Sequence, residues 1–225
     1  MNKHFTVAID GPSGAGKSTI AKMCAKRFGF VYVDTGAIYR SVGLAVKRAG
    51  VGSKDAEGVE KVLSKVELDI RYSPDGLQHM YLSGEDVTEE IREPEISIYA
   101  SDISAMPPVR AFLLEMQRSM ARSHSVIMDG RDIGTVVLKD ADLKIFLTAE
   151  DYERAQRRYD ELMVRGIMTT YDEVLKDIKY RDQNDSTRET APLRPAEDAV
   201  ILDTTGNSLD ESFEIISKII QEHME

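Results

Sequence analysis

A glycine-rich segment, Gly11-Pro-Ser-Gly-Ala-Gly-Lys-Ser18, has the residue types and spacing of a phosphate-binding loop. It follows an apolar run ending at Ile9 and precedes a helical pattern, which is the context that such a loop requires. The glycines let backbone N–H groups turn inward and hold nucleotide phosphates at the positive end of the next helix. Lys17 would contact the β- and γ-phosphates, and the Ser18 hydroxyl would contact Mg²⁺. The alternative is a glycine-rich turn with an unrelated lysine, and the agreement of spacing and flanks argues against it.

A second charged segment, Asp129-Gly-Arg-Asp132, lies at the end of a strongly apolar strand. Charged residues in such a place rarely serve packing, because a buried charge without a partner is costly. Arg131 has the planar fork that binds a phosphate with two hydrogen bonds, and Asp129 could order the magnesium shell. A structural ion pair between Arg131 and one of the two aspartates is the alternative.

A third segment, Asp34-Thr-Gly-Ala-Ile-Tyr-Arg40, follows another short strand. Thr35, Tyr39 and Arg40 can face the crevice beyond the carboxyl ends of the strands. In isolation, the sequence favours a simpler interpretation, in which Asp34 caps a helix and Arg40 is a solvated surface residue.

Arginines recur on two later predicted helices. Residues at helical spacing share one face in each of two sets: Arg154, Arg157 and Arg158, and Arg181, Asp185 and Arg188. A solvated helix with ion pairs to Asp151 and Glu153 would show similar spacing. However, a paired surface face would use lysine as readily, so the predominance of arginine favours phosphate recognition.

The composition is that of a soluble globular protein, with 225 residues, 42% hydrophobic and 30% charged. No apolar stretch approaches the length of a membrane span, and the polar start Met1-Asn-Lys-His4 lacks an apolar signal core, so we expect a cytoplasmic protein with no membrane partner. The single cysteine, Cys24, excludes an internal disulfide and has the helical spacing of a buried residue. The net charge of −10 argues against nucleic acid as a partner. An acidic protein that binds polyphosphate must concentrate its positive charge locally.

Apolar runs alternate with helical patterns, which predicts an α/β fold: a parallel five-stranded sheet with helices on both faces. The predicted strands are 3–9, 30–33, 125–129, 142–147 and 199–203. The predicted helices are 17–27, 36–49, 55–65, one on either side of Met106-Pro-Pro108, 150–165, 171–189 and a final helix. Capping boxes at Thr170 and Ser208 define two helix starts. Alternation around Ser73-Pro-Asp-Gly76 predicts a hairpin of 66–72 and 77–82, within an antiparallel insertion of about 66–92.

Other classes of phosphate-loop protein fit less well. A GTP switch needs a guanine-binding Asn-Lys-x-Asp motif, and the sequence has none. Leu82-Ser-Gly-Glu85 lacks the second glycine and the glutamine of the transporter ATPase signature. The four histidines have neither metal-ligand nor catalytic-triad spacing.

Together, these motifs resemble the bacterial cytidylate kinase family of nucleoside monophosphate kinases. The resemblance extends from Ile9 through the last strand and rests on five segments: Ile9-Asp-Gly-Pro-Ser-Gly-Ala-Gly-Lys-Ser18, Asp34-Thr-Gly-Ala-Ile-Tyr-Arg40, Asp129-Gly-Arg-Asp-Ile-Gly-Thr-Val-Val137, Lys144-Ile-Phe-Leu147 and Arg181-Asp-x-x-Asp185. It implies one P-loop kinase domain over 1–225, with the 66–92 insertion bordering the monophosphate site and a helical lid with its following helix at about 150–189. A monomer is the family's default.

The resemblance also implies a role for each matching position. The expected CMP-binding residues are Thr35, Tyr39, Arg40, Ser101, Arg110, Gly130, Arg131, Asp132, Arg181, Asp185 and Arg188. Among these, Arg40, Arg131 and Arg188 would hold the phosphate; Ser101, Arg110 and Asp132 the cytosine; and Arg181 and Asp185 the sugar. The expected ATP-binding residues are Gly11, Pro12, Ser13, Gly14, Ala15, Gly16, Lys17, Ser18, Thr19 and Arg157. The expected catalytic residues are Lys17, Arg131, Arg154 and Arg158, with Arg154 and Arg158 on the lid. Ser18 and Asp129 would serve Mg²⁺, although the family often carries glycine at the position of Ser18.

The expected reaction is transfer of the γ-phosphoryl group of ATP to CMP. The acceptor is already ionised, so no general base is required, and positioning and charge neutralisation carry the catalysis. An aspartate at position 132 would accept from the amino group of cytosine and repel the carbonyl of uracil. We expect dCMP to be accepted as well. The alternatives are a kinase for another acceptor, such as UMP, dTMP or a small metabolite, and a nucleotide-binding regulatory module that hydrolyses slowly and signals to a partner.

Overall fold

The computed structural model of the chain describes residues 4–225 and contains the predicted parallel sheet. Its five strands, in the order β2-β6-β1-β7-β8, all run parallel. The strands are β1 (Thr6–Asp10), β2 (Val31–Asp34), β6 (Val126–Gly130), β7 (Leu143–Thr148) and β8 (Val200–Asp203). The predicted start of the first strand, residue 3, lies outside the described residues.

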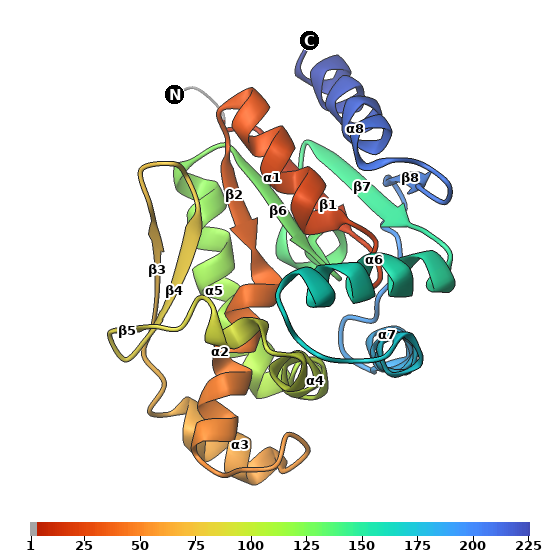
Figure 1. The fold of residues 1–225 in the computed structure, drawn as a ribbon. Helices are drawn as coiled ribbons and strands as arrows, with labels where there is room; N and C mark the ends of the chain where they lie inside the picture. The colour runs from red at the N-terminus through yellow and green to blue at the C-terminus, as the bar shows by residue number, and fades with distance from the viewer. Residues whose placement is uncertain (1–3) are drawn as a thin grey trace.

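Helices cover both faces of the sheet because successive strand residues point to opposite sides. Val7 and Ile9 of β1 pack into one core cluster, with helices α1 (Lys17–Phe28) and α8 (Leu209–Met224). Ala8, between them, packs into the other cluster, with α2 (Thr35–Arg48), α4 (Pro94–Ile103) and α5 (Pro107–Ser123). Figure 1 shows the sheet between these two layers. The prediction of helices on both faces is confirmed.

The segment after α2 forms the predicted antiparallel insertion. Following α3 (Ala56–Leu63), β3 (Leu68–Tyr72) and β4 (Gln78–Leu82) pair as a hairpin, and the short β5 (Glu85–Asp86) adds a third strand that was not predicted. The hairpin is attached to the main sheet by two contacts. The Asp34 N–H donates to Gln78 Oε1 at 2.8 Å, and the Tyr72 hydroxyl donates to the Tyr32 carbonyl at 3.0 Å.

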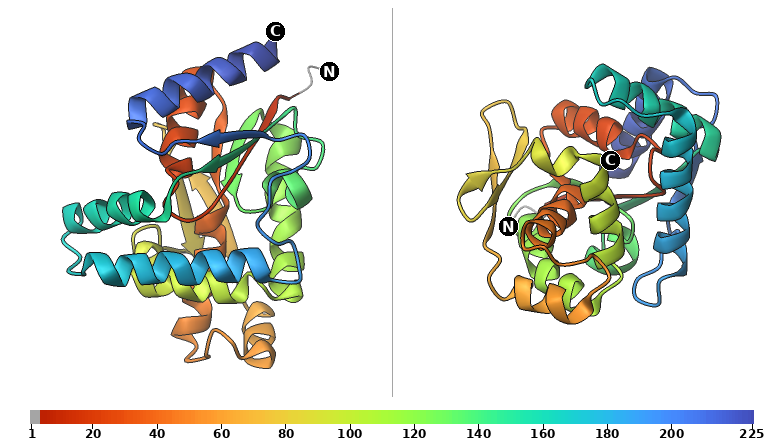
Figure 2. Two further views of the ribbon diagram at one scale, coloured as in Figure 1. Left: turned by 90° about the vertical axis from the view of Figure 1, so that its right-hand side faces the viewer. Right: turned by 60° about the horizontal axis from the view of Figure 1, so that its bottom comes forward.

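Two helices, α6 (Asp151–Val164) and α7 (Tyr171–Thr187), lie side by side below the sheet in the left view of Figure 2. They share a small core of their own, formed by Ala155, Leu162, Val174 and Ile178, separate from the two clusters on the sheet. Both predicted capping boxes are present, at Thr170 before α7 and at Ser208 before α8. No helix among residues 4–225 is both long enough and apolar enough to cross a membrane.

Two short irregular helices were not predicted: η1 (Glu90–Arg92) and the π-type η2 (Ile133–Val137). The second directly follows β6 and therefore sets the path of the chain after Asp132. Asp10, at the end of β1, accepts the N–H groups of Ile133 and Gly134 at 2.7 and 2.8 Å. A contact between residues more than a hundred positions apart leaves no local pattern in the sequence.

Candidate functional site

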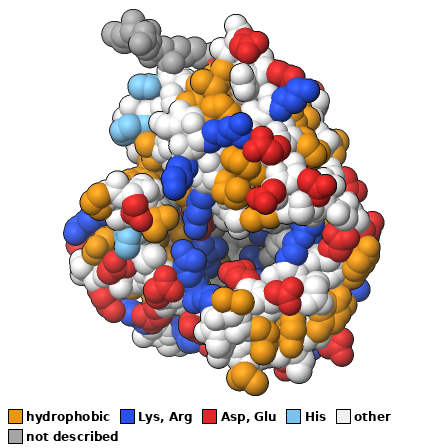
Figure 3. Space-filling view, turned by 45° about the horizontal axis from the view of Figure 1, so that its top comes forward, with side chains coloured by type: hydrophobic (Ala, Val, Ile, Leu, Met, Phe, Trp, Pro, Cys, Tyr) orange, Lys and Arg blue, Asp and Glu red, His pale blue; other side chains and the backbone are white. Residues whose placement is uncertain are grey.

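A cavity of about 580 Å³ opens beyond the carboxyl ends of β2 and β6, beside the glycine-rich loop. Ligands of open parallel sheets bind at this edge. Ten basic and five acidic side chains line the cavity, although the chain has a net charge of −10. Figure 3 shows Lys and Arg side chains gathered in and around a hollow in the surface. The expected local concentration of positive charge is therefore present.

The glycine-rich loop joins β1 to α1 and packs against the end of β7. A Cβ on Gly11 would lie only 1.9 Å from the Leu147 carbonyl oxygen, so no side chain fits there. Lys17 is buried in the first turn of α1 and donates from Nζ to the Pro12 carbonyl at 2.7 Å. The Lys17 side chain therefore folds back across the loop, where its amine could contact phosphates bound to the loop.

Burial and, second, the positive charge of Arg131 together lower the pKa of Lys17 from 10.5 to about 7. Asp129 and Asp10 act in the opposite direction. Burial is the largest cause, so the charged amine lacks a solvating partner that a bound anion would supply. Such a site favours a bound anion.

Asp129 lies beside the loop and is shared by two hydroxyl groups. Ser18 donates to its Oδ2 at 2.8 Å, and Tyr32 donates to its Oδ1 at 2.9 Å. Burial raises the pKa of Asp129, and the nearby Asp34 carboxylate raises it further. A hydroxyl and a carboxylate are hard oxygen donors, so this pair fits Mg²⁺, which commonly takes one or two protein ligands together with substrate phosphates.

The opposite wall of the cavity contains a network of buried arginines and aspartates. Arg131 donates from Nε to Asp185 of α7 at 2.7 Å. It therefore makes no ion pair within its own segment, and the alternative of a local pair with Asp129 or Asp132 is wrong. Asp132 instead forms ion pairs with both Arg110 of α5 and Arg188, the latter at 3.3 Å.

Among the arginines in this wall of the cavity, Arg181 has the fewest partners for its positive charge. Its Nε atom is buried without a hydrogen-bond partner, and it makes no ion pair with any residue of 4–225. Burial and, second, the positive charge of Arg131 together lower the pKa of Arg181 to about 10. A buried guanidinium nitrogen without an acceptor is costly, so this side chain fits a ligand that supplies acceptor oxygens.

For the segment after β2, the sequence suggested either a helix cap at Asp34 or side chains that face the cavity, and the structure shows both. Asp34 does cap α2, because its Oδ1 accepts the Ala37 N–H at 2.7 Å. Arg40, however, is not a solvated surface residue: it lines the cavity and pairs with Asp34 at 3.0 Å. Burial alone would raise the pKa of Asp34, but Arg40 and the Ala37 N–H bring it below its usual value. Thr35, the first residue of α2, donates to the Asp129 carbonyl at 2.7 Å and so joins the start of α2 to β6.

The structure brings nearly all of the predicted site residues to one cavity. These are Ser13, Gly14, Ala15, Gly16, Lys17, Ser18, Thr19, Thr35, Tyr39, Arg40, Ser101, Arg110, Asp129, Gly130, Arg131, Asp132, Arg157, Arg158, Arg181, Asp185 and Arg188. Three predicted residues do not line it: Gly11, Pro12 and Arg154. Arg154 instead donates to the carbonyls of Ala149 and Ser13, both at 2.8 Å.

Several cavity residues were missed by sequence reasoning. Lys22 of α1 and Arg92 of η1 add positive charge, and Ser104 and Gln117 add polar groups. The loop after β8 and the first turn of α8 close one end with Asn207, Ser208, Leu209 and Ser212. For this loop the capping box at Ser208 is a usable signal, since it places a helix N-terminus there. Isolated residues such as Lys22 and Arg92 have no motif that could have identified them.

Comparisons with known proteins agree with this geometry. A model of the family described as cytidylate kinase matches residues 7–222. The chain is 49% identical over 219 residues to a cytidylate kinase of Caldicellulosiruptor bescii, covering 97% of this chain and 95% of that protein. It is 47% identical over 222 residues to a cytidylate kinase of Leuconostoc mesenteroides, covering 98% of each.

Among solved structures, an uncharacterized protein from Eubacterium ventriosum aligns with a TM-score of 0.53 at 14% identity, covering 98% of this chain and 99% of the other. That similarity supports the fold alone. The family match and the close relatives both span nearly the whole chain. The chain therefore belongs to the cytidylate kinase family and is a nucleoside monophosphate kinase.

Proposed function

We propose that this protein transfers the γ-phosphoryl group of ATP to CMP, and to dCMP, in a reaction that requires Mg²⁺. One observation supports this most strongly: the glycine-rich loop with Lys17 and the cluster of Arg131, Arg181 and Arg188 open into the same cavity. A kinase that joins two anions needs a donor pocket and an acceptor pocket that face each other. The names of the most similar relatives agree with CMP as the acceptor.

The proposed base specificity depends on Asp132. Its carboxylate is almost fully buried between Arg110 and Arg188, whose side chains are also nearly inaccessible. Held in this way, it can accept a hydrogen bond from the amino group of cytosine but would repel the carbonyl oxygen of uracil. Ser101 lines the same wall and is fixed by Asn184, which donates to its hydroxyl oxygen at 3.0 Å.

The protein's own groups would act by positioning and charge neutralisation. Lys17 and the guanidinium groups of Arg131 and Arg158, which all line the cavity, would balance the charge on the transferring phosphoryl group. Ser18 and Asp129 would hold Mg²⁺ or waters bound to it. When bound, the metal ion supplies further charge neutralisation at the phosphates of ATP. No histidine lines the cavity among the described residues, as expected for an acceptor that needs no base.

The 150–189 segment is proposed as the lid. Its two helices share a small core of their own, which would hold them together as the lid closes. Arg157 and Arg158 project from this segment into the cavity. Arg157 also donates to the Thr204 carbonyl at 2.9 Å, next to the loop of Asn207 that closes one end of the cavity. We place the ATP base at that end.

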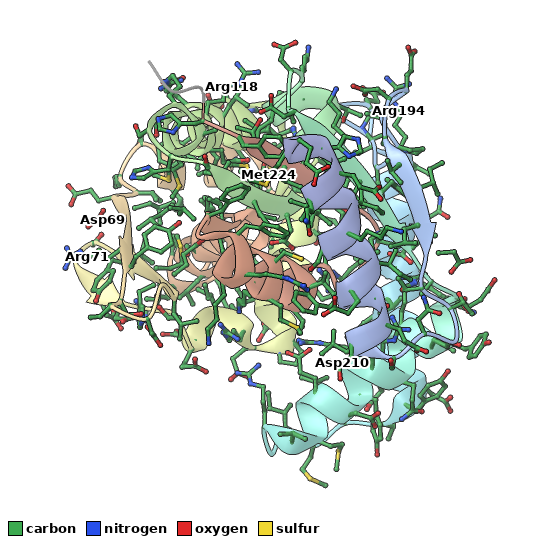
Figure 4. The ribbon with its side chains drawn as sticks, turned by 90° about the horizontal axis from the view of Figure 1, so that it is seen from above. Asp69, Arg71, Arg118, Arg194, Asp210 and Met224 are labelled. Atoms are coloured by element: carbon green, nitrogen blue, oxygen red, sulfur yellow. The ribbon has the colours of Figure 1, made fainter. Side chains whose placement is uncertain are left out.

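The 66–92 insertion is proposed to border the acceptor pocket without supplying its base-binding groups. Gln78 holds the start of α2 through both the N–H and the carbonyl of Asp34. Asp69 and Arg71, on the outer strand β3, lie at the edge of the molecule in Figure 4, and both are exposed. The cavity-lining residue of this segment is Arg92, at its end.

The test is a phosphoryl-transfer assay with ATP and CMP, dCMP or UMP for wild type and two variants. We expect Asp132→Asn to lower the preference for CMP over UMP by about 10- to 100-fold, because an amide can also donate to uracil and one base contact is worth about 1–3 kcal/mol. Arg131→Ala should lower transfer to all three acceptors by a similar factor. If wild type converts UMP as fast as CMP, the proposed specificity is wrong.

A further inference from the structure

Helix α7 carries residues that point in two directions. Arg181 and Asp185, together with Arg188 directly after the helix, line the cavity on its acceptor side. Asp182 directly follows Arg181, and because successive residues are rotated by about 100° on a helix, it faces elsewhere. It does not line the cavity. Its role is therefore not direct contact with either substrate.

Asp182 instead contacts the outer side of the glycine-rich loop. Its Oδ1 accepts the Ser13 N–H at 3.2 Å, and its Oδ2 accepts Arg154 Nη1 at 2.6 Å. The same Arg154 nitrogen donates to the Ser13 carbonyl at 2.8 Å. Both polar groups of Ser13's backbone are thus bound by an ion pair formed between α6 and α7.

The ion pair is well enclosed. The Arg154 side chain is 7% exposed and that of Asp182 is 22% exposed. The loop also packs tightly against α6, since a Cβ on Gly14 would lie 2.8 Å from the Arg154 carbonyl oxygen. In such surroundings, removing the carboxylate leaves a buried guanidinium with one fewer acceptor and frees the Ser13 N–H.

We propose that Asp182 is a positioning residue that ties the donor loop to the acceptor-binding helix α7, so that a bound monophosphate tightens the binding of ATP. The proposal rests on the proposed function, because it assigns ATP to the loop and CMP to the side of Arg181 and Asp185. A monophosphate that holds Arg181 and Asp185 restrains α7. Through Asp182, that restraint reaches Ser13 of the loop, which lowers the cost of ordering the loop around the phosphates of ATP.

The experiment measures coupling by calorimetry with AMP-PNP, an ATP analogue that does not transfer its phosphoryl group. Its dissociation constant is determined with and without saturating CMP, for wild type, Asp182→Ala, Asp182→Asn and Asp172→Ala. Asp172 is an exposed carboxylate on the same helix and serves as the matched control for the charge change. The dissociation constant of CMP alone is measured for each variant.

We expect CMP to tighten AMP-PNP binding by wild type within the usual allosteric range of about 5- to 150-fold. Asp182→Ala should lose most of this effect while binding CMP alone within about twofold of wild type. Asp182→Asn, which keeps an oxygen for the Ser13 N–H, should retain part of it. Asp172→Ala should behave as wild type.

Coupling of wild-type size in Asp182→Ala would overturn the inference. So would an equal loss of affinity for CMP alone, since that would mean general damage to α7. If Asp182→Ala does not fold, full coupling in Asp182→Asn has the same meaning. A wild-type enzyme that phosphorylates CMP without any coupling would overturn this inference alone, whereas one that does not bind CMP would overturn the proposed function as well.

Discussion

At the scale of single residues, burial sets the charge state of Lys17 in the glycine-rich loop before a nucleotide binds. Burial and the neighbouring Arg131 and Arg181 bring the pKa of Lys17 to about 7. Phosphate oxygens bound beside it would favour the charged amine and raise that pKa again. Nucleotide binding above pH 7 should therefore take up a proton.

This uptake is the first prediction. At pH 8, binding of ADP or AMP-PNP should take up nearly one proton, since a group with a pKa of about 7 is then mostly neutral in the free enzyme. At pH 5.5 the uptake should vanish. Calorimetry in HEPES and in Tris, which differ in ionisation enthalpy, measures it. Lys17→Arg is the control, because arginine stays charged. Uptake that persists in Lys17→Arg would assign the proton to another group.

The same shift affects stability in a defined direction. In the unfolded chain Lys17 keeps its proton to near pH 10.5, whereas in the ligand-free fold it loses it near pH 7. Between these values the unfolded state binds more protons, so the Lys17 contribution to stability becomes more favourable as the pH rises. Below pH 7 the full cost of burying the charged amine is present.

At this scale, sequence reasoning identified residue types well and pairings less well. The spacing around Lys17 and the isolated Asp129-Gly-Arg-Asp132 segment were enough to predict phosphate-binding groups. The partner of Arg131 was not predictable, because Asp185 is 54 positions away and the local aspartates looked equally suitable. Arg154 shows the same limitation: helical spacing placed it with Arg157 and Arg158, but its side chain turns toward Ser13.

At the scale of secondary structure, the helices that hold the site begin at strong local signals. Thr170 accepts the Glu173 N–H, and the Glu173 carboxylate in turn accepts the Thr170 N–H at 2.8 Å. This capping box begins α7, the helix that carries Arg181 and Asp182. Its signal is local, so the sequence was sufficient to place it. By contrast, η2 depends on Asp10 of a distant strand and was missed.

The capping box leads to the second prediction. Thr170→Ala should destabilise the first turn of α7 by about 1 kcal/mol, because the N-terminal N–H groups lose an acceptor. Native-state hydrogen exchange should show roughly fivefold lower protection in that turn and little change in the sheet. Thr169→Ala is the matched control, since Thr169 contacts Glu173 but accepts no backbone N–H. Equal losses in both variants would contradict the assignment of the cap.

At the scale of the whole molecule, the main feature is the contrast between overall and local charge. The chain carries −10, yet basic side chains outnumber acidic ones in the cavity by two to one. Exposed acidic residues favour solubility. Folding brings the arginines of the cavity close together, where their mutual repulsion opposes stability. A bound anion relieves that repulsion.

The third prediction concerns the stabilisation that a bound anion should provide. CMP at about 100 times its dissociation constant should stabilise the protein by about 2.7 kcal/mol, which corresponds to a rise in melting temperature of roughly 5–10 °C for a chain of this size. Differential scanning calorimetry measures the shift. Cytidine at the same concentration, in potassium chloride of matched ionic strength, should produce a much smaller one, because it lacks the phosphate. An equal shift with cytidine would show that the base alone provides the binding energy.

Patterns along the chain were enough to predict the glycine-rich loop, the parallel sheet with its two helical layers, the hairpin insertion and the helix caps. The loop, the hairpin, the caps and each single strand or helix depend on residues close together in the chain, and the alternation of strands with helices predicts their parallel arrangement. The tertiary structure decided which charges meet. Only folding brings together the segments that carry three contacts: Asp132 with Arg110 and Arg188, Asp185 with Arg131, and Asp182 with Ser13. In a buried site, electrostatic energy depends on distance and burial rather than on position in the chain.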